Sequence, residues 1–279
     1  MSEIVAGTLY VVATPIGNLG DLTPRAREVL AGVSAIGAED TRNTAVLLGQ
    51  FGIGPPLVAV HDHNEGDIAA KLVARLQAGD SLALVSDAGT PLVSDPGYRL
   101  VRAVREAGLP VVPVPGACAA IAALSVAGIP SDRFCFEGFL PVKGGARRER
   151  LGELLSETRT LVFYESSHRI EESLADLVAV FGPEREATLG RELTKRFETL
   201  LGPTLAAIQQ AVAADANQRK GEFVLVVRGS VDREAAQLAE GKRLYAKLAA
   251  HLKPSQAAKL AAELSGAPRK ALYVGGDAS

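Results

Sequence analysis

The stretch LALVSDAGTPLVSDPG, residues 82–97, joins an apolar run to a turn rich in Gly, Pro and Ser-Asp pairs. Its first residues, Leu82 to Val85, are all apolar, as in a strand that is buried on both faces of a sheet. The residues that follow contain Gly and Pro, which end a strand. The stretch therefore predicts a central strand of a parallel sheet, followed by a loop at its carboxyl end.

The same pattern repeats outward in both directions as far as Gly128, because short β-branched runs alternate with amphipathic segments. Thr23-Pro24 supplies an N-cap and a first-turn proline for the first helical segment. Strands that alternate with helices indicate a parallel sheet covered on both faces. The expected strands are TLYVVATP (8–15), VSAIGAE (33–39), PPLVAVH (55–61), SLALVSD (81–87) and LPVVPVPG (109–116).

The second half is less regular, and its sheet is expected to include antiparallel pairs. After Gly229 the sequence turns to Ala, Lys and Leu, and residues 252–273 resemble two short helices joined by Ser265 to Pro268. The fold class is therefore α/β, with a parallel-sheet domain, a mixed-sheet domain and a small helical tail. We expect domains at 1–129, 130–229 and 230–279.

Loops that follow parallel strands are the expected place for a ligand. Asp87 offers a carboxylate, Gly89 lets backbone approach a ligand, and Thr90 offers a hydroxyl. The alternative is a polar turn in which Ser94-Asp95 caps the next helix.

The next strand ends in VPGACAA, where Gly116 precedes a helix whose first amides suit an acceptor-rich group. The small residues Ala117, Cys118 and Ala119 would let a flat ring approach, although tight helix packing explains them equally well. Neither G-x-G-x-x-G nor G-x-x-x-x-G-K-[ST] occurs, so NAD and ATP are not expected.

Composition and charge limit the binding partners and the cellular location to be expected. The chain has 279 residues, 47% of them hydrophobic, and a formal net charge of −2, which argues against indiscriminate polyanion binding. Of the three expected domains, only residues 230–279 contain more Lys and Arg than Asp and Glu, eight against five. The two cysteines, Cys118 and Cys135, suggest reduced thiols. The N-terminus lacks the basic segment of a signal peptide, and prolines interrupt the longest uncharged run, 109–131. We expect a cytoplasmic protein with no membrane span.

Several long motifs, in order, are similar to those of the ribosomal RNA small-subunit methyltransferase I family, a branch of the tetrapyrrole methylase superfamily. They are PIGNLGDLTPRA, GAEDTRNTAVLL, HDHNE, VSDAGTPLVSDPG, VPGACAAIAAL, GFLP, FYESSHRI, GRELTKRFE and KGEFVLVV. The resemblance implies a homodimer that binds S-adenosylmethionine between two domains. It also implies methylation of a cytidine ribose 2′-hydroxyl in small-subunit ribosomal RNA, either free or in the assembled subunit.

The resemblance also implies which residues hold the cofactor. They are Ser86, Asp87, Gly89 and Thr90 in one loop, Gly116, Cys118 and Ala119 in the other, and Tyr164 and Glu222 in the second domain. Corrin-methylating relatives usually show GDP where this chain has SDAG, which favours RNA over a tetrapyrrole.

Methyl transfer to a ribose hydroxyl needs no metal, so positioning of the two reactants should dominate. A side chain that takes the hydroxyl proton would add to the rate by about 10² to 10⁴-fold. The candidates are His63, Glu65, Glu165 and Glu192. A metal held by His61 and His63 is conceivable, but no cysteine partners accompany them and we expect none.

Contacts to RNA phosphates need local basic residues. Candidate substrate contacts are Asp40, Arg42, Asn64, Lys143, Arg147, Arg148, Arg169, Arg191 and Lys195. Asp40 has a second interpretation as a helix cap, and charged runs are often only solvated faces. Tyr164, Phe139 and Phe197 could stack on a base, although aromatic residues at strand ends more often belong to a core.

Two other functions compete with the RNA enzyme. The first is a tetrapyrrole methylase with the same fold and cofactor. The second is a non-catalytic RNA-binding or assembly protein.

Overall fold

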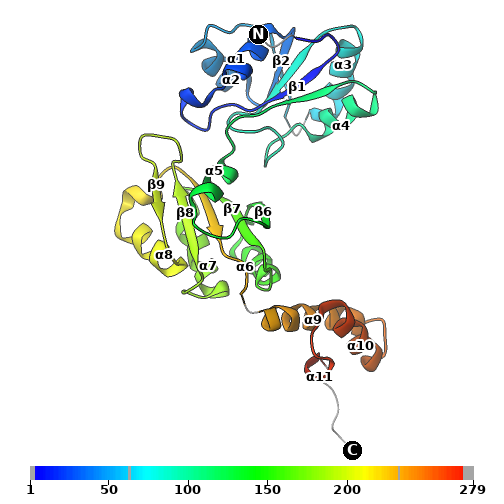
Figure 1. The fold of residues 1–279 in the computed structure, drawn as a ribbon, viewed down its shortest axis with the longest axis vertical. Coiled ribbons are helices and arrows are strands. Elements are labelled where there is room, and N and C mark those ends of the chain that lie inside the picture. Colours follow the sequence, from blue (N-terminus) through cyan, green and yellow to red (C-terminus); the bar gives the residue numbers. More distant parts are fainter. Residues whose placement is uncertain (1–3, 62–63, 232, 273–279) are drawn as a thin grey trace, which may run out of the picture. The chain divides into compact units, whose positions relative to one another are not determined.

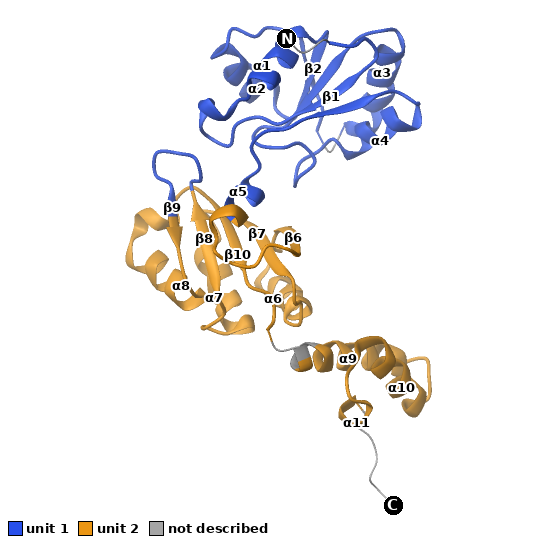
Figure 2. Ribbon diagram, in the orientation of Figure 1, with its two compact units in different colours: residues 1–123, 192–199 blue, residues 124–191, 200–279 orange. Residues whose placement is uncertain are grey.

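The structure is a computed structural model that describes residues 4–61, 64–231 and 233–272. The chain forms two compact units, which Figure 2 shows in separate colours. The first unit holds residues 1–123 and 192–199, and the second holds 124–191 and 200–279. Among the described residues, no helix has the length and apolar character needed to cross a membrane.

The first unit is built on a five-stranded sheet whose described strands pair in parallel (Figure 1). The strand order is β3-β2-β4-β1-β5. The strands are β1 (Leu9–Val12), β2 (Ala35–Ala38), β3 (Leu57–Ala59), β4 (Leu82–Val85) and β5 (Val111–Val114). The helices are α1 (Pro24–Gly32), α2 (Thr41–Gly49), α3 (Glu65–Gln77), α4 (Tyr98–Glu106) and α5 (Ala119–Val126), with a 3₁₀ turn η1 at Leu19–Asp21.

Both faces of this sheet are covered, as the run at Leu82 predicts. Ala83 and Val85 of β4 pack in one apolar cluster with side chains of α1 and α2. Leu82 and Leu84 pack in a second cluster with side chains of α3 and α4. Alternate residues of the central strand therefore belong to cores on opposite faces.

The second unit contains a mixed five-stranded sheet with the order β6-β7-β10-β8-β9. β6 pairs with β7 in parallel, and β10 is antiparallel to both β7 and β8. The strands are β6 (Phe134–Phe139), β7 (Thr160–Ser166), β8 (Ala187–Arg191), β9 (Thr199–Leu201) and β10 (Glu222–Val227). The helices are α6 (Gly144–Leu154), α7 (Ile170–Phe181) and α8 (Leu205–Ala214), with a 3₁₀ turn η2 at Ala216–Arg219.

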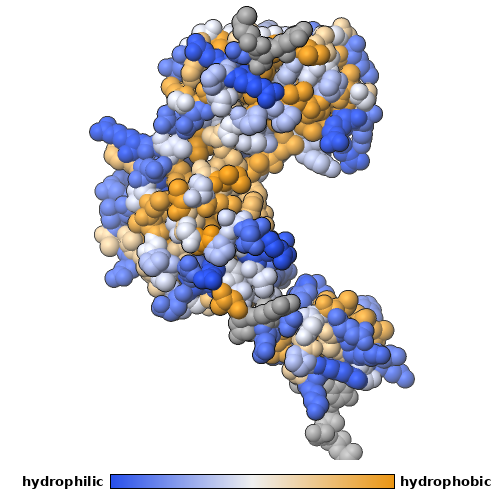
Figure 3. Space-filling model, in the orientation of Figure 1, coloured by the Kyte–Doolittle hydropathy of each residue, from blue (hydrophilic) through white to orange (hydrophobic). Residues whose placement is uncertain are grey.

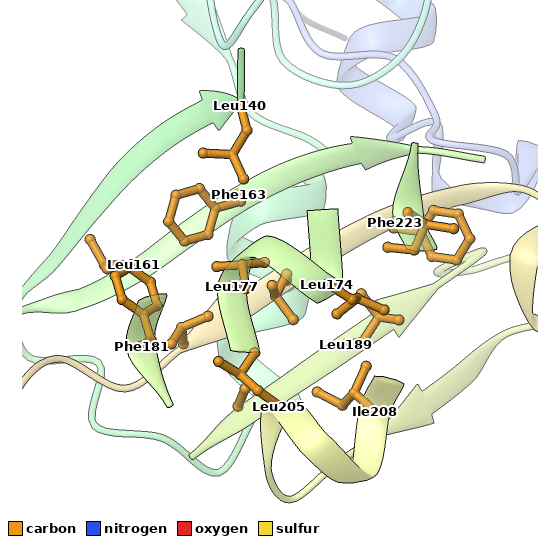
Figure 4. Close-up of a cluster of buried hydrophobic side chains, with 14 of the residues drawn as sticks. Leu140, Leu161, Phe163, Leu174, Leu177, Phe181, Leu189, Leu205, Ile208 and Phe223 are labelled. Atoms are coloured by element: carbon orange, nitrogen blue, oxygen red, sulfur yellow. The ribbon is translucent and has the colours of Figure 1, made fainter. Parts of the chain in front are cut away.

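The core of the second unit lies between one face of this sheet and its helices. In Figure 4, Phe163 of β7 and Phe223 of β10 lie in the cluster with Leu174 and Leu177 of α7 and Ile208 of α8. Each of these five side chains is at most 2% exposed. The parallel sheet, the mixed sheet and the helical tail confirm the predicted fold class.

The tail folds as three helices: α9 (Arg233–Ala249), α10 (Pro254–Ser265) and α11 (Arg269–Leu272). Leu272 and Ala261 are buried together, with Leu248 packed against them, so the module has a small core of its own. The sequence predicted α10 and α11 but gave no bounds for α9. The tail face seen in Figure 3 carries both hydrophilic and hydrophobic residues.

Candidate functional site

Three loops meet at the carboxyl edge of the first sheet. Thr14, just after β1, exchanges two backbone hydrogen bonds with Gly89, after β4, with N–O distances of 2.8 and 3.1 Å. The Thr90 hydroxyl donates to the carbonyl of Ala117, after β5, at 2.9 Å. The two loops singled out in the sequence are therefore joined to each other and to the β1 loop.

Glycine is required where these loops touch. A Cβ on Gly116 would lie 2.9 Å from the Cβ of Ala13 and 3.3 Å from its carbonyl oxygen. Gly89 has φ +84°, and a Cβ there would lie 3.3 Å from a methyl carbon of Ile16. Gly116 is nevertheless exposed, so its backbone faces the outside just before α5. Exposed backbone amides near the start of a helix can bind a polar ligand.

Carboxylates gather at the same edge. Asp87 accepts a hydrogen bond from the Asp40 amide at 3.1 Å and another from the Asn43 side chain at 2.8 Å. The Asp87 amide donates to the Glu39 carboxylate at 3.4 Å. Burial, together with the charges of Glu39 and Asp87, raises the pKa of Asp95 to about 6. This edge therefore carries negative charge that favours a cationic ligand.

Asp40 and Arg42 lie beside this group at the start of α2. The Asp40 carboxylate accepts from the Arg42 amide at 2.8 Å, so it caps the helix as one interpretation of the sequence expected. It also pairs with the exposed Arg42 guanidinium at 2.6 Å, and the pKa of Asp40 is lowered to about 2. Contact of either residue with RNA stays a prediction.

Residues 192–199, which run from the end of β8 to the first residue of β9, belong to the first unit (Figure 2). Glu192 and Lys195 form an ion pair at 2.9 Å. The Lys195 stem lies so close to Gly17, in the loop after β1, that a Cβ on Gly17 would lie 2.4 Å from the lysine Cε. The segment is thus anchored at the carboxyl edge of the first sheet.

Two of the proposed proton acceptors, Glu65 and Glu165, make structural hydrogen bonds. The buried Glu65 carboxylate accepts a hydrogen bond from the Leu100 amide at 2.9 Å and so caps α4. This also corrects the expected cap by Ser94-Asp95, because the residue before α4 is Gly97 and no side-chain cap is present there.

Glu165 is 5% exposed and fully engaged within the second unit. It accepts from the Ser173 hydroxyl at 2.5 Å, from the Arg169 guanidinium at 2.7 Å and from the Ser166 amide at 2.8 Å. These three hydrogen bonds give the Glu165 carboxylate a structural role within the second unit. Its role as a general base stays a prediction.

The structure places the candidates His63, Asn64 and Glu192 differently. His63 lies outside the described residues. The Asn64 side chain accepts from the His61 amide at 2.9 Å and donates to the Ala59 carbonyl at 3.0 Å, closing the turn after β3. Glu192 is the candidate whose carboxylate lies on the loop anchored at the candidate site.

Three arginines expected to contact RNA make structural contacts, and Arg147 and Arg191 are buried in them. Arg147, 2% exposed, donates to Asp176 at 2.7 Å, and Arg191, 7% exposed, donates to the Lys220 carbonyl at 2.7 Å. Arg169 donates to the Leu140 carbonyl at 3.0 Å, besides its bond to Glu165. Burial disfavours contact of Arg147 and Arg191 with a phosphate, and the RNA contact of all three stays a prediction.

Lys143 and Arg148 are exposed, so they can still reach a phosphate. Arg148 pairs with Asp176 at 3.0 Å while its side chain remains 56% exposed. Their contact with RNA stays a prediction, as does that of Lys195.

Tyr164 and Glu222 lie in the second unit, on β7 and β10. The Tyr164 ring makes edge contacts with Phe136 and Phe139, at centroid distances of 4.9 and 5.7 Å. A bulge between Phe136 and Gly138, which has φ +63°, turns Phe139 toward this ring. Their contact with the cofactor stays a prediction.

Sequence reasoning missed Glu39 and Asp95 and the role of Gly17. Glu39 could have been found, because it directly follows a predicted strand, where site residues are expected. No signal in the sequence indicates that Gly17 lies against Lys195, because the two are far apart along the chain. Within the described part of the chain, no group of three or more His, Cys, Asp or Glu side chains could hold a metal ion.

Comparison with known proteins defines the class first. Residues 8–209 match the family model for tetrapyrrole (corrin/porphyrin) methylases, and residues 235–274 match that for the RsmI C-terminal HTH domain. Among solved structures, the methyltransferase CobJ covers 80% of this chain and 95% of its own, with a TM-score of 0.58 at 22% identity. A Thermus thermophilus uroporphyrin-III C-methyl transferase, complexed with S-adenosyl homocysteine, has a TM-score of 0.53 at 20% identity. The match covers 78% of this chain and 96% of that one. These structures share the fold.

Curated relatives specify the family further. The ribosomal RNA small subunit methyltransferase I of Xylella fastidiosa (strain Temecula1) is 63% identical over 96% of this chain and 98% of its own. The protein of the same name from Escherichia coli O157:H7 is 55% identical over 96% of this chain and 93% of its own. The chain belongs to the ribosomal RNA small subunit methyltransferase I family.

Proposed function

We propose that this protein transfers a methyl group from S-adenosylmethionine to the 2′-hydroxyl of a cytidine ribose in small-subunit ribosomal RNA. The observation that carries the proposal is the 63% identity, over nearly the full chain, to a relative named for methylation of this RNA. The joined loops at the carboxyl edge of the first sheet support it.

The residues at this edge fit the methyl donor. S-adenosylmethionine, when bound, supplies a methyl group on a positively charged sulfur. Glu39, Asp87 and Asp95 place negative charge here, which suits a cation. The exposed backbone at Gly116 and the hydroxyl at Thr90 suit the polar parts of the ligand. Ser86, Gly89, Cys118 and Ala119 complete the proposed set, with Tyr164 and Glu222 from the second unit.

The chain must also receive the proton that leaves the ribose hydroxyl. Glu192 is the described candidate for this step, because Glu65 and Glu165 serve the fold. Its ion pair with Lys195, at 2.9 Å, holds the carboxylate on the loop anchored beside Gly17. His63 remains a second candidate.

Binding of the donor can be measured by calorimetry on the full chain. Asp87→Ala and Gly116→Val should weaken S-adenosylmethionine binding, because the first removes a charge and the second places a side chain against Ala13. Glu192→Gln should leave this affinity near normal while lowering turnover. Unchanged affinity in both loop variants would contradict the assignment of the site.

The setting proposed for this activity is the cytoplasm, with a homodimer acting on ribosomal RNA or on the small subunit. Residues 230–279 are proposed as a basic module that contacts phosphates. The alternative is that Leu248, Leu252, Leu260 and Leu264 pack on the second domain or at a dimer interface. Leu248 packs within the tail's own cluster, whereas Leu252, Leu260 and Leu264 are exposed.

A further inference from the structure

An exposed aromatic ring with a cation stacked on it lies on the segment 192–199. The Phe197 side chain is 63% exposed. The guanidinium carbon of Arg196 lies 5.5 Å from the centre of the Phe197 ring. Both side chains are exposed, so a cation and an aromatic ring lie together at the surface of this loop.

The segment is held in one conformation by its own hydrogen bonds. The Thr194 amide donates to the Glu198 carboxylate at 2.6 Å, and the Glu198 amide donates to the Lys195 carbonyl at 3.1 Å. Glu192 and Thr194 have φ of +49° and +68°, which non-glycine residues rarely adopt. Such backbone persists only where its surroundings fix it, so the ring is presented by a preformed loop.

The loop is also fixed in place. Lys195 immediately precedes the exposed pair, and its stem lies against Gly17, after β1. The loop after β1 is the one whose Thr14 bonds to Gly89. Arg196 and Phe197 are thus attached to the edge where the methyl donor is proposed to bind.

We infer that Phe197 and Arg196 bind a nucleotide of the substrate RNA, with an unpaired base stacked on the Phe197 ring and a backbone phosphate held by Arg196. The inference rests on the proposed function and assigns the pair to substrate recognition. Single-stranded RNA is recognised by this combination, because every base has a face for stacking and every linkage a negative charge. A protein partner would call for a larger apolar patch than a single ring beside a cation.

The test measures the affinity of the full chain for ribosomal RNA by filter binding, which does not require methyl transfer. Phe197→Ala should weaken binding by about tenfold or more, as loss of one stacked base does. Phe197→Tyr, which keeps a ring, should bind near normally, and Phe197→Leu should bind as poorly as the alanine variant. Arg196→Ala should weaken binding and reduce the salt slope by about one phosphate contact.

Matched controls are Phe134→Ala, an aromatic residue 40% exposed at the start of β6, and Arg105→Ala, an exposed cation in the last turn of α4. Both should bind RNA normally, and all variants should retain normal S-adenosylmethionine affinity. Normal RNA binding by Phe197→Ala, or by Phe197→Leu, overturns the inference alone. No RNA affinity in the unaltered chain overturns both the inference and the proposed function.

Discussion

The stem of Lys195 occupies the space beside Gly17 that a side chain would need. A Cβ on Gly17 would lie 2.4 Å from the lysine Cε and 2.5 Å from its Cγ. The two residues are remote in sequence, yet their contact attaches the segment 192–199 to the first unit. This contact makes the position of the proposed substrate loop depend on one glycine.

Gly17→Ala should therefore displace Lys195 and lower RNA methylation by about tenfold. The matched control is Gly79→Ala, because Gly79 also has a positive φ, +97°, but has no atom within 4 Å of its would-be Cβ. Both variants should lose about 1 kcal/mol of stability from backbone strain. Steady-state kinetics with ribosomal RNA should separate them, and equal rates would show that the contact has no functional role.

Arg147→Ala should destabilise the second unit by about 3–5 kcal/mol, because it leaves the Asp176 carboxylate, 8% exposed, without its buried partner. The control is Arg148→Ala, which removes a half-exposed partner of the same carboxylate and should cost about 1 kcal/mol or less. Urea unfolding measures both values. A small loss for Arg147→Ala, with weaker RNA binding, would restore its place in substrate contact.

Asp95 should make the stability of the protein depend on pH between about 4 and 6. Its pKa of about 6 in the folded chain exceeds its ordinary value of 3.8, so the folded chain binds the proton more tightly. The contribution of Asp95 to stability should therefore fall as pH rises through this window and be constant above it. Asp95→Asn should remove this slope, which thermal unfolding at a series of pH values would show. A variant with the same slope as the unaltered chain would contradict the assignment.

Removal of residues 230–279 should leave S-adenosylmethionine binding intact, because the proposed cofactor loops lie elsewhere. It should weaken RNA binding and flatten its salt dependence, since the tail carries eight basic residues against five acidic ones. Filter binding at several salt concentrations measures both effects. A truncated protein that unfolds or becomes monomeric would show instead that the tail serves the fold or the dimer.

Local patterns in the sequence were sufficient to predict most of the fold. Thr23 caps α1 by accepting the Ala26 amide at 3.1 Å, as Thr23-Pro24 indicated, and both faces of β4 are buried as its apolar run required. These features could be predicted from short stretches of sequence. Gly241 in α9 could not, because glycine weakens a helix and its reason lies in a distant contact. A Cβ on Gly241 would lie 2.8 Å from the Cβ of Ala267, so the glycine allows close packing.

The tasks of the charged residues could not be predicted in this way. Glu65 caps a helix 35 residues further along the chain, and Arg147 pairs with a carboxylate 29 residues away. A sequence shows which residues carry charge but not which of them the fold buries against each other. The candidate loops were found because strand ends are visible locally, whereas the proton acceptors and RNA contacts depended on such distant pairs.

The most direct test of the central claim is to map the methyl group that the full chain transfers. The protein is incubated with S-adenosylmethionine labelled in its methyl group and with unmodified ribosomal RNA or small subunits, with a porphyrinoid as a parallel substrate. The account predicts label on one cytidine ribose 2′-oxygen and little label with Asp87→Ala. Label on a base or on the porphyrinoid, or none on RNA in either form, would contradict it.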